Sequence, residues 1–169
     1  PLLEVTNPVS RFNGYRYRVM VVGSCTPSLT SATATLTVNE IPEVTVEPVA
    51  KTICEEANTF FTVSAGATTA PSYRWQVDTG SGTFTDIGSD TGVYSGTGTS
   101  NLFLTGVPSS YDGYLYHVIV SGVCAPPAPS ADVLLTVNEN PEIITPPESD
   151  TICEGDAATF SVDAGATTV

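Results

Sequence analysis

Apolar and polar residues alternate along most of this chain, and turn-forming residues recur at short intervals. In the sequence SYRWQV, Tyr73, Trp75 and Val77 occupy every second position, which places them on one face of a β-strand. The sequence NLFLTGV at 101–107 alternates in the same way. No stretch of about eleven residues shows helical periodicity. The pattern therefore predicts an all-β fold.

The same criteria predict a series of short strands bounded by Gly, Pro, Asn and Asp. The predicted strands cover residues 43–48, 58–65, 72–77, 83–87, 92–96, 101–107, 114–123 and 131–138. The strand at 114–123 is the longest, and apolar residues on both of its faces predict a central position in a sheet. The CAPPAPS sequence is expected to lack regular structure because of its prolines. So many short strands indicate a two-sheet sandwich.

The sequence repeats itself at a spacing of 99 residues. TICEEANTFFTVSAGATT at 52–69 returns as TICEGDAATFSVDAGATT at 151–168, and GYRYRVMVVGSC at 14–25 returns as GYLYHVIVSGVC at 113–124. The gapless alignment at this spacing pairs 70 residues, of which 32 are identical. Such self-similarity at a fixed period is the sequence signature of a tandem array.

Prolines mark the boundary between repeats. Pro42 and Pro141 follow the recurring LTVNE segments, and proline cannot extend a strand ladder. Residues 41–139 are therefore predicted to be one complete repeat. Residues 1–40 are predicted to be the C-terminal part of the preceding repeat and residues 140–169 the N-terminal part of the next, so the sequence is expected to be a piece of a longer chain.

A tryptophan on the third predicted strand, the motif L-x-L-x-x-V and the sequence DGYLY at the start of the longest strand resemble the immunoglobulin-like fold. The resemblance implies that Trp75 is the core tryptophan and Tyr116 the corner tyrosine. Phe61 or Val63, and Val118, occupy the positions at which antibody domains carry their inter-sheet disulfide. The predicted fold class is thus all-β, with tandem immunoglobulin-like β-sandwich repeats of about 99 residues.

A longer string of motifs, from ICE through F-x-V-x-A-G, Y-x-W-Q-V and YSG to GY-x-Y-x-V-x-V-x-G-x-C, resembles the Ig-like repeats of very large secreted proteins of Bacteroidota. Those proteins include surface adhesins and gliding-motility proteins exported by the type 9 secretion system. The resemblance implies a non-enzymatic stalk or adhesin segment on the bacterial cell surface. Neighbouring repeats are the expected partners, and surface glycans or other cells would be bound by regions outside this sequence.

Two alternative functions follow from the same resemblance. The first is a subunit of a self-assembling extracellular filament, in which repeats of different chains pack together. The second is an accessory binding module of a secreted polysaccharide-degrading enzyme. Fold-level likeness does not separate them, because one fold serves many functions.

Each repeat carries two cysteines, one before the second strand and one after the longest strand. Cys54 and Cys124 belong to the complete repeat, while Cys25 and Cys153 lie in the flanking parts and are expected to have partners outside this sequence. Three states stay open: a bridge between Cys54 and Cys124, a bridge between consecutive repeats, and unpaired thiols. In immunoglobulin topology the second strand starts at one end of the sandwich and the longest strand finishes at the other. The two cysteines of one repeat would then be about 25 Å or more apart, whereas a disulfide needs Cα atoms within roughly 7 Å.

The chain is strongly acidic, with 18 Asp and Glu against 5 Lys and Arg and a net charge of -13. Nucleic acid and anionic membranes favour cationic surfaces, so neither is an expected partner. No apolar run reaches the roughly 18 to 20 residues that span a membrane, so membrane insertion is not expected.

No cofactor is expected. Acidic residues near the repeat junctions leave Ca²⁺ as a candidate, but they lack a known ligand spacing: Glu40, Glu43, Glu139, Glu142, Asp150 and Asp156.

Several residues have a catalytic interpretation that their context disfavours. Asp78 and Asp90 open D-T-G triplets like those of aspartic proteases, but they lie close together in predicted turns rather than in two buried lobes. Glu55 and Glu56 are adjacent and cannot flank a glycosidic bond. His117 is expected to be an exposed strand residue. We therefore expect no catalytic residues and no enzymatic activity.

Two further patterns point to carbohydrate. Tyr94, Tyr111, Tyr114 and Trp75 would form a sugar-stacking platform if they were exposed together, but their alternation favours core packing. The sequence DTI at 150–152 resembles the O-glycosylation acceptor of Bacteroidota, and the equivalent KTI sequence in the complete repeat lacks the aspartate.

Overall fold

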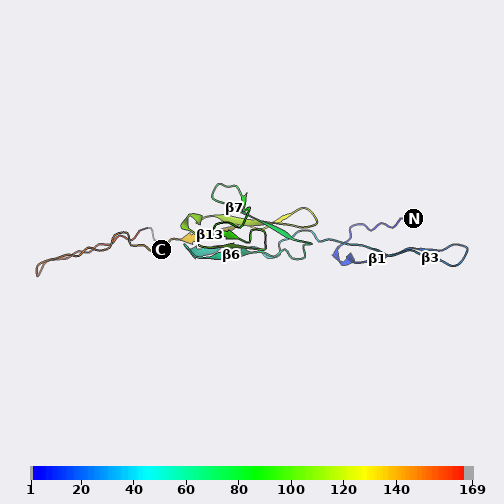
Figure 1. The fold of residues 1–169 in the computed structure, drawn as a ribbon, viewed down its shortest axis with the longest axis horizontal. Helices are drawn as coiled ribbons and strands as arrows, with labels where there is room; N and C mark the ends of the chain where they lie inside the picture. Colours follow the sequence, from blue (N-terminus) through cyan, green and yellow to red (C-terminus); the bar gives the residue numbers. More distant parts are fainter. Residues whose placement is uncertain (1, 166–169) are drawn as a thin grey trace.

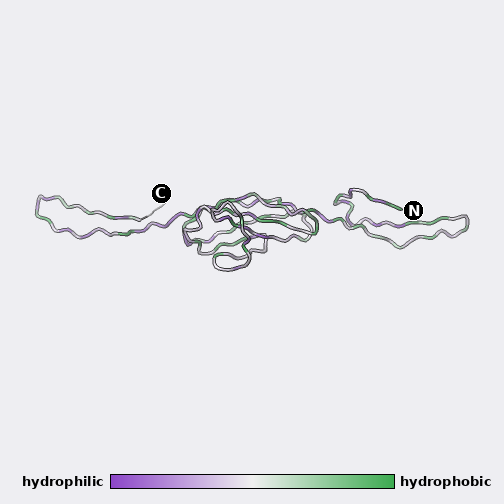
Figure 2. Tube along the Cα trace, turned by 90° about the horizontal axis from the view of Figure 1, so that it is seen from above, coloured by the Kyte–Doolittle hydropathy of each residue, from purple (hydrophilic) through white to green (hydrophobic). Residues whose placement is uncertain are grey.

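The computed structural model describes residues 2–165, which form a β-sandwich with one extended arm at each end (Figure 1). The strands of the sandwich lie between Lys51 and Asn138, and we call residues 2–40 the N-terminal arm and residues 140–165 the C-terminal arm. The arms leave from opposite ends of the sandwich, as Figures 1 and 2 both show. No α-helix occurs in the described residues, and none of their helical turns is long and apolar enough to cross a membrane.

Two sheets form the sandwich. The smaller sheet has the order β6-β10-β9, and the larger has the order β5-β13-β11-β7-β8 with β12 paired to β11. The strands are β5 (Lys51–Cys54), β6 (Thr59–Thr62), β7 (Ser72–Asp78), β8 (Thr85–Asp86), β9 (Tyr94–Ser95), β10 (Asn101–Leu104), β11 (Leu115–Ser121), β12 (Ala128–Pro129) and β13 (Val133–Asn138). The pairs are antiparallel except for β5 and β13, which run parallel.

The strand β11 is central in the larger sheet, as its apolar pattern predicts. It pairs with β7 along its whole length and with β12 and β13 on its other edge. Tyr116, Val118 and Val120 point into the core and are fully buried, while the residues between them are half-buried. A strand covered in this way carries apolar residues on both faces.

The core between the sheets is built around three aromatic rings. The centroid of the Phe61 ring lies 5.0 Å from that of Tyr116 and 6.4 Å from that of Trp75. All three side chains, and that of Val118, are fully buried. Trp75 Nε1 donates a hydrogen bond of 2.9 Å to the Thr99 carbonyl, which satisfies the polar atom of this buried ring.

The first strand lies later in the sequence than predicted. Residues 43–48 contribute one bridge, between Val46 and Ser64, and the strand is β5 instead. Strand β5 runs parallel to β13, with Cys54 opposite Asn138. Because this partner lies more than eighty residues away in the sequence, no local turn or hairpin signal marks the strand.

The proline-rich loop also departs from the prediction, because it contains β12. Ala128 and Pro129 pair with Val120 and Ile119 of β11. A proline is tolerated here because β12 is a short edge segment, where a missing backbone donor costs little.

The N-terminal arm repeats the local structure of residues 100–139. Its elements are the 3-10 turn η1 (Ser10–Phe12), β1 (Arg16–Tyr17) paired with β4 (Ala34–Thr35), and β2 (Met20–Val21) paired with β3 (Leu29–Thr30). The turn η1 corresponds to η2 (Ser109–Tyr111) in the sandwich. Val19 N donates to Ser31 Oγ at 3.0 Å, as Val118 N donates to Ser130 Oγ at 3.0 Å. Hydrogen bonds therefore recur at the spacing of 99.

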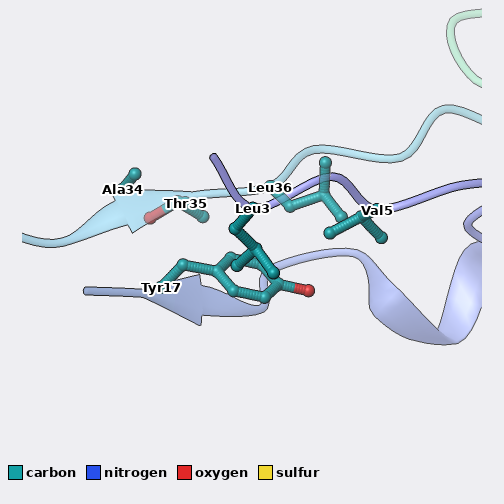
Figure 3. Close-up of a pocket in the computed structure, with 6 residues that line it drawn as sticks. All are labelled: Leu3, Val5, Tyr17, Ala34, Thr35 and Leu36. Atoms are coloured by element: carbon teal, nitrogen blue, oxygen red, sulfur yellow. The ribbon is translucent and has the colours of Figure 1, made fainter. Parts of the chain in front are cut away.

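The arms expose apolar residues whose counterparts in the sandwich are buried. Leu3, Val5, Tyr17 and Leu36 line an open hollow in the N-terminal arm, where Leu3 lies over the ring of Tyr17 (Figure 3). Their counterparts in the sandwich, one repeat later, are all fully buried: Leu102, Leu104, Tyr116 and Leu135. Apolar segments also occur along the C-terminal arm (Figure 2).

Candidate functional site

The chain before the sandwich is hydrogen-bonded to the loops at one end of it. Glu40 N donates to Thr69 Oγ1 at 2.8 Å, and Glu43 N donates to Thr68 Oγ1 at 3.1 Å. In return, Ala67 N donates to Glu43 Oε1 at 3.2 Å. We call this contact the N-side joint.

Three residues after β11 complete the N-side joint. Val123 N donates to the Thr69 carbonyl at 3.1 Å, and Cys124 Sγ lies 3.7 Å from the Asn39 carbonyl oxygen. Gly122 packs so closely that a Cβ there would lie 2.9 Å from the Thr69 carbonyl oxygen. The chain that enters the sandwich is thus held against two loops at once.

The chain after the sandwich is held in a similar way at the opposite end. Asn140 N donates to Glu55 Oε1 at 3.0 Å, and Glu55 N donates to the Asn138 carbonyl at 2.8 Å. Cys54 lies beside Asn138 in the parallel pairing of β5 with β13. We call this contact the C-side joint.

The two cysteines of the sandwich lie in different joints and do not face each other. From the Leu115–Leu134 pair, β13 continues to Asn138, opposite Cys54, while β11 runs the other way toward Cys124. At about 3.3 Å per residue the two cysteines are roughly 40 Å apart. All four cysteines are free, and this separation excludes a bridge between Cys54 and Cys124 within one sandwich.

Asp78 and Asp90 hold turns, and nothing in their surroundings resembles a protease dyad. Asp78 Oδ1 accepts hydrogen bonds from the N–H groups of Gly80, Ser81 and Gly82 at 2.8 to 3.1 Å, and from Ser81 Oγ. Burial by itself raises the pKa of Asp78, but these four donors outweigh it and hold the pKa below its usual value. The Thr97 N–H and hydroxyl likewise lower the pKa of Asp90.

This arrangement predicts a pH-dependent loss of stability. Because the folded pKa of Asp78 is depressed, its contribution is present above the ordinary aspartate pKa of about 3.9 and is lost as the pH falls below it. An Asp78→Asn variant should be less stable than the natural protein at pH 7, and the gap should narrow at pH 3. Urea unfolding at both pH values measures it.

The exposed Asp156 in the C-terminal arm provides a control for this prediction, because no hydrogen bond to its side chain is found among residues 2–165. Asp156→Asn should leave the free energy of unfolding of the sandwich unchanged at both pH values. A gap between the natural protein and Asp78→Asn that is equally large at pH 7 and pH 3 would show that the charge of Asp78 contributes nothing.

His117 is less exposed than predicted. Its ring stacks on Phe84 with centroids 4.0 Å apart, and its side chain is 13% exposed. Nδ1 lies 2.8 Å from Asp132 Oδ1 and Nε2 lies 2.6 Å from Gln76 Oε1. Both ring nitrogens are therefore engaged, and the ring packs on the larger sheet rather than facing a cleft.

The tyrosines predicted as core or sugar platform form a cluster at one end of the core. Tyr94 Oη and Tyr116 Oη lie 3.1 Å apart, and the rings of Tyr111 and Tyr114 have centroids 4.8 Å apart. Burial raises the pKa of Tyr94 and Tyr116 well above its usual range, so both phenols stay neutral. Trp75 lies in the core and contributes no exposed face to a platform.

Glu55 holds Asn140 through its side chain, and Glu56 occupies the adjacent turn with φ of 63°. The hydroxyl-bearing Thr151 is exposed, and its N–H donates to Asp150 Oδ1 at 2.8 Å. Among residues 2–165, no three His, Cys, Asp or Glu side chains gather closely enough to hold a metal ion.

Comparison with solved structures identifies the fold. A 3Ig structure of titin domains, an E-to-A variant, matches 74% of this chain and 43% of its own length, with 19% identity and a TM-score of 0.54. An I-band fragment of titin matches 66% of this chain and 37% of its own, with 21% identity and a TM-score of 0.52. Immunoglobulin domains 1–5 of Sidekick-1 match 74% of this chain and 25% of their own length, with 13% identity and a TM-score of 0.51.

The chain thus spans less than half of each of these structures. No family model and no curated protein matches the sequence. The likeness to multidomain Ig structures and the two-sheet architecture confirm the predicted fold class. The chain is an all-β protein of tandem immunoglobulin-like β-sandwich repeats.

The residues of both joints were absent from the sequence-based candidates, apart from the cysteines and acidic residues considered for other roles. Thr68 and Thr69 lie between predicted strands, where small polar residues are common for many reasons, and Gly122 lies near the end of the predicted strand 114–123. The sequence carries one signal for these residues: Thr68, Thr69 and Gly122 each have an identical residue 99 positions away. Outside regular strands, such recurrence indicates a contact that every repeat makes.

Proposed function

We propose that this chain is a non-enzymatic segment of a long extracellular repeat protein that acts as a stalk or adhesin on a bacterial cell surface, in adhesion or gliding motility. The observation that carries the proposal is the position of the two joints. The chain enters the sandwich at one end and leaves at the other, and each linker is hydrogen-bonded to the end that it passes. Consecutive repeats are then directed along one line, as in a rod.

Two further observations support a rod. The net charge of -13 causes neighbouring rods to repel each other, which favours separate, extended chains. The acidic side chains with catalytic interpretations are used to hold turns and linkers, as Asp78 and Glu55 show. Binding of surface glycans or other cells would then belong to other domains of the full protein.

The length of an array tests the proposal. Chains that contain one, two and four tandem copies of residues 41–139, each between the natural flanking arms, should lengthen by roughly 40 Å per added copy. Small-angle X-ray scattering gives the maximum dimension, and atomic force microscopy of single molecules gives the contour. An increase in length of less than half this value per copy would show that the repeats fold back on one another. The proposal of a stalk would then be wrong.

The same arrays separate the stalk from the alternatives. Imaging should show strands of single-chain thickness, whereas multi-chain cross-sections would support the filament. The accessory-module alternative predicts that the natural chain binds polysaccharide, which isothermal titration against a panel of glycans measures. The only exposed aromatic pair that we find on the smaller sheet of the described sandwich, Phe60 and Phe103, is the natural place to test by alanine substitution if binding is seen.

A further inference from the structure

The two joints are the two halves of one recurring junction. Val38 N donates to Asn13 Oδ1 at 3.0 Å, and one repeat later Val137 N donates to Asp112 Oδ1 at 2.8 Å. The backbone therefore approaches the end of each repeat in the same way. An asparagine follows each of these valines, so the two asparagines occupy equivalent places in the array.

Each of these asparagines lies beside a cysteine, but a different one. At the C-side joint Asn138 pairs with Cys54, and its carbonyl accepts the N–H of Glu55 at 2.8 Å. At the N-side joint the carbonyl of Asn39 lies 3.7 Å from Cys124 Sγ. The first cysteine belongs to the repeat that ends at its asparagine, and the second belongs to the repeat that begins after it.

Where one repeat follows another, both contacts fall on the same asparagine. Its carbonyl oxygen accepts a hydrogen bond from the N–H of the residue after the first cysteine. The same oxygen also lies close to the sulfur of the second cysteine. Two hydrogen-bond-length contacts and the fixed peptide geometry place the Cα of one cysteine at most roughly 9 Å from the sulfur of the other. A disulfide needs Cα atoms within roughly 7 Å, and this upper bound on the Cα–Sγ distance leaves the pair within reach of one.

We propose that Cys54 of one repeat and Cys124 of the next repeat form a disulfide across the junction. Such bridges would recur at every junction and link the repeats into a covalently fastened rod. The proposal concerns how repeats are joined and holds whether or not the array serves as a stalk. It also accounts for four free cysteines in a chain in which no complete junction between two full sandwiches occurs.

Formation of the bridge requires an oxidant, which we take to be a disulfide-bearing molecule such as oxidised glutathione or an oxidised dithiol protein. The thiolate of one cysteine attacks a sulfur of the oxidant and releases one of its thiolates, leaving a mixed disulfide. The second cysteine then attacks the mixed disulfide and releases the other thiolate. Two protein thiols are oxidised, two protons leave, and the oxidant gains two electrons.

The test uses the full chain with residues 41–139 duplicated in tandem, which creates one complete junction. After exposure of the dilute protein to oxidised glutathione, peptide mass spectrometry without reduction should show one bridge, from Cys54 of the first copy to Cys124 of the second. The other four cysteines should remain open to alkylation. A bridge within one copy, or six alkylated cysteines, would overturn the proposal.

Matched substitutions identify the pair. Cys54→Ser in the first copy, or Cys124→Ser in the second, should abolish the bridge, whereas Cys124→Ser in the first copy should leave it intact. Circular dichroism and the fluorescence of Trp75 report whether each variant is folded. The natural, unduplicated chain provides an independent measurement, because all four of its cysteines should stay alkylatable after the same oxidation, and a link between its own Cys54 and Cys124 would refute the geometry.

Discussion

Replacement of Phe61 by alanine should lower the free energy of unfolding of the sandwich by about 3 to 5 kcal/mol. Phe61 is fully buried and contacts both other aromatic rings of the core, Tyr116 and Trp75. Its removal leaves a cavity between the two sheets that neighbouring side chains cannot fill, because each is held in a strand. A domain of this size is stable by about 5 to 15 kcal/mol, so the variant loses a large share of its stability.

Urea denaturation monitored by tryptophan fluorescence measures this effect. The chain contains one tryptophan, Trp75, which lies in the core of the sandwich, so the signal reports on this unit and not on the arms. A shift of the midpoint at unchanged slope indicates a change in stability without a change in the unfolded state.

Two other phenylalanines are matched controls. Phe60 is the neighbour of Phe61 on β6 but is 46% exposed, and it contacts only the Phe103 ring and the Lys51 ammonium in its aromatic interactions. Phe60→Ala should cost about 1 kcal/mol or less. Phe160, the counterpart of Phe61 in the C-terminal arm, is exposed, and Phe160→Ala should leave the sandwich unchanged. Equal losses for Phe61→Ala and Phe60→Ala would contradict the two-sheet core.

The part of the fold that the sequence predicts is the part that depends on periodic burial. Trp75, Tyr116 and Phe61 lie on strands whose alternate residues face a core, and that alternation is visible in any one strand. Strand β5 was missed because a parallel pairing with β13 depends on a residue far along the chain. The environment of His117 was missed for a similar reason, since the Phe84 ring that covers it comes from another segment.

The joints were harder to predict because they consist of polar contacts between loops. A threonine hydroxyl that caps a backbone N–H, such as Thr69 with Glu40, has no periodicity and can occur in any turn. The sequence pairs two cysteines in each repeat and already indicates that they are far apart, but which residue lies beside Cys54 follows only from the pairing of β5 with β13, which places it opposite Asn138. The sequence of a single strand shows which of its faces is buried. The contacts that join two repeats can be identified only when the structures of both ends of the sandwich are known.

Replacement of Gly122 by valine should loosen the N-side joint and destabilise the sandwich by about 1 to 3 kcal/mol. A Cβ at this position would lie 2.9 Å from the Thr69 carbonyl oxygen and from Thr68 Cγ2, and 3.5 Å from Pro42 Cγ. Because one of these neighbours is backbone, the linker and the loop must move apart. Hydrogen exchange should then be at least about tenfold faster at the N–H groups of Glu40 and Glu43.

Gly23 makes the test specific, because it is the same residue of the preceding repeat and its surroundings are open. A Cβ there meets only the backbone of Cys25, at 3.9 Å or more. Gly23→Val should therefore change neither exchange at the joint nor the stability of the sandwich by more than about 0.5 kcal/mol. If Gly122→Val left exchange at Glu40 and Glu43 unaltered, the linker would not be fastened to the loops, and successive repeats could swivel. In tandem arrays the loosened variant should also be more flexible than the Gly23→Val array, which connects this glycine to the rigidity of the rod.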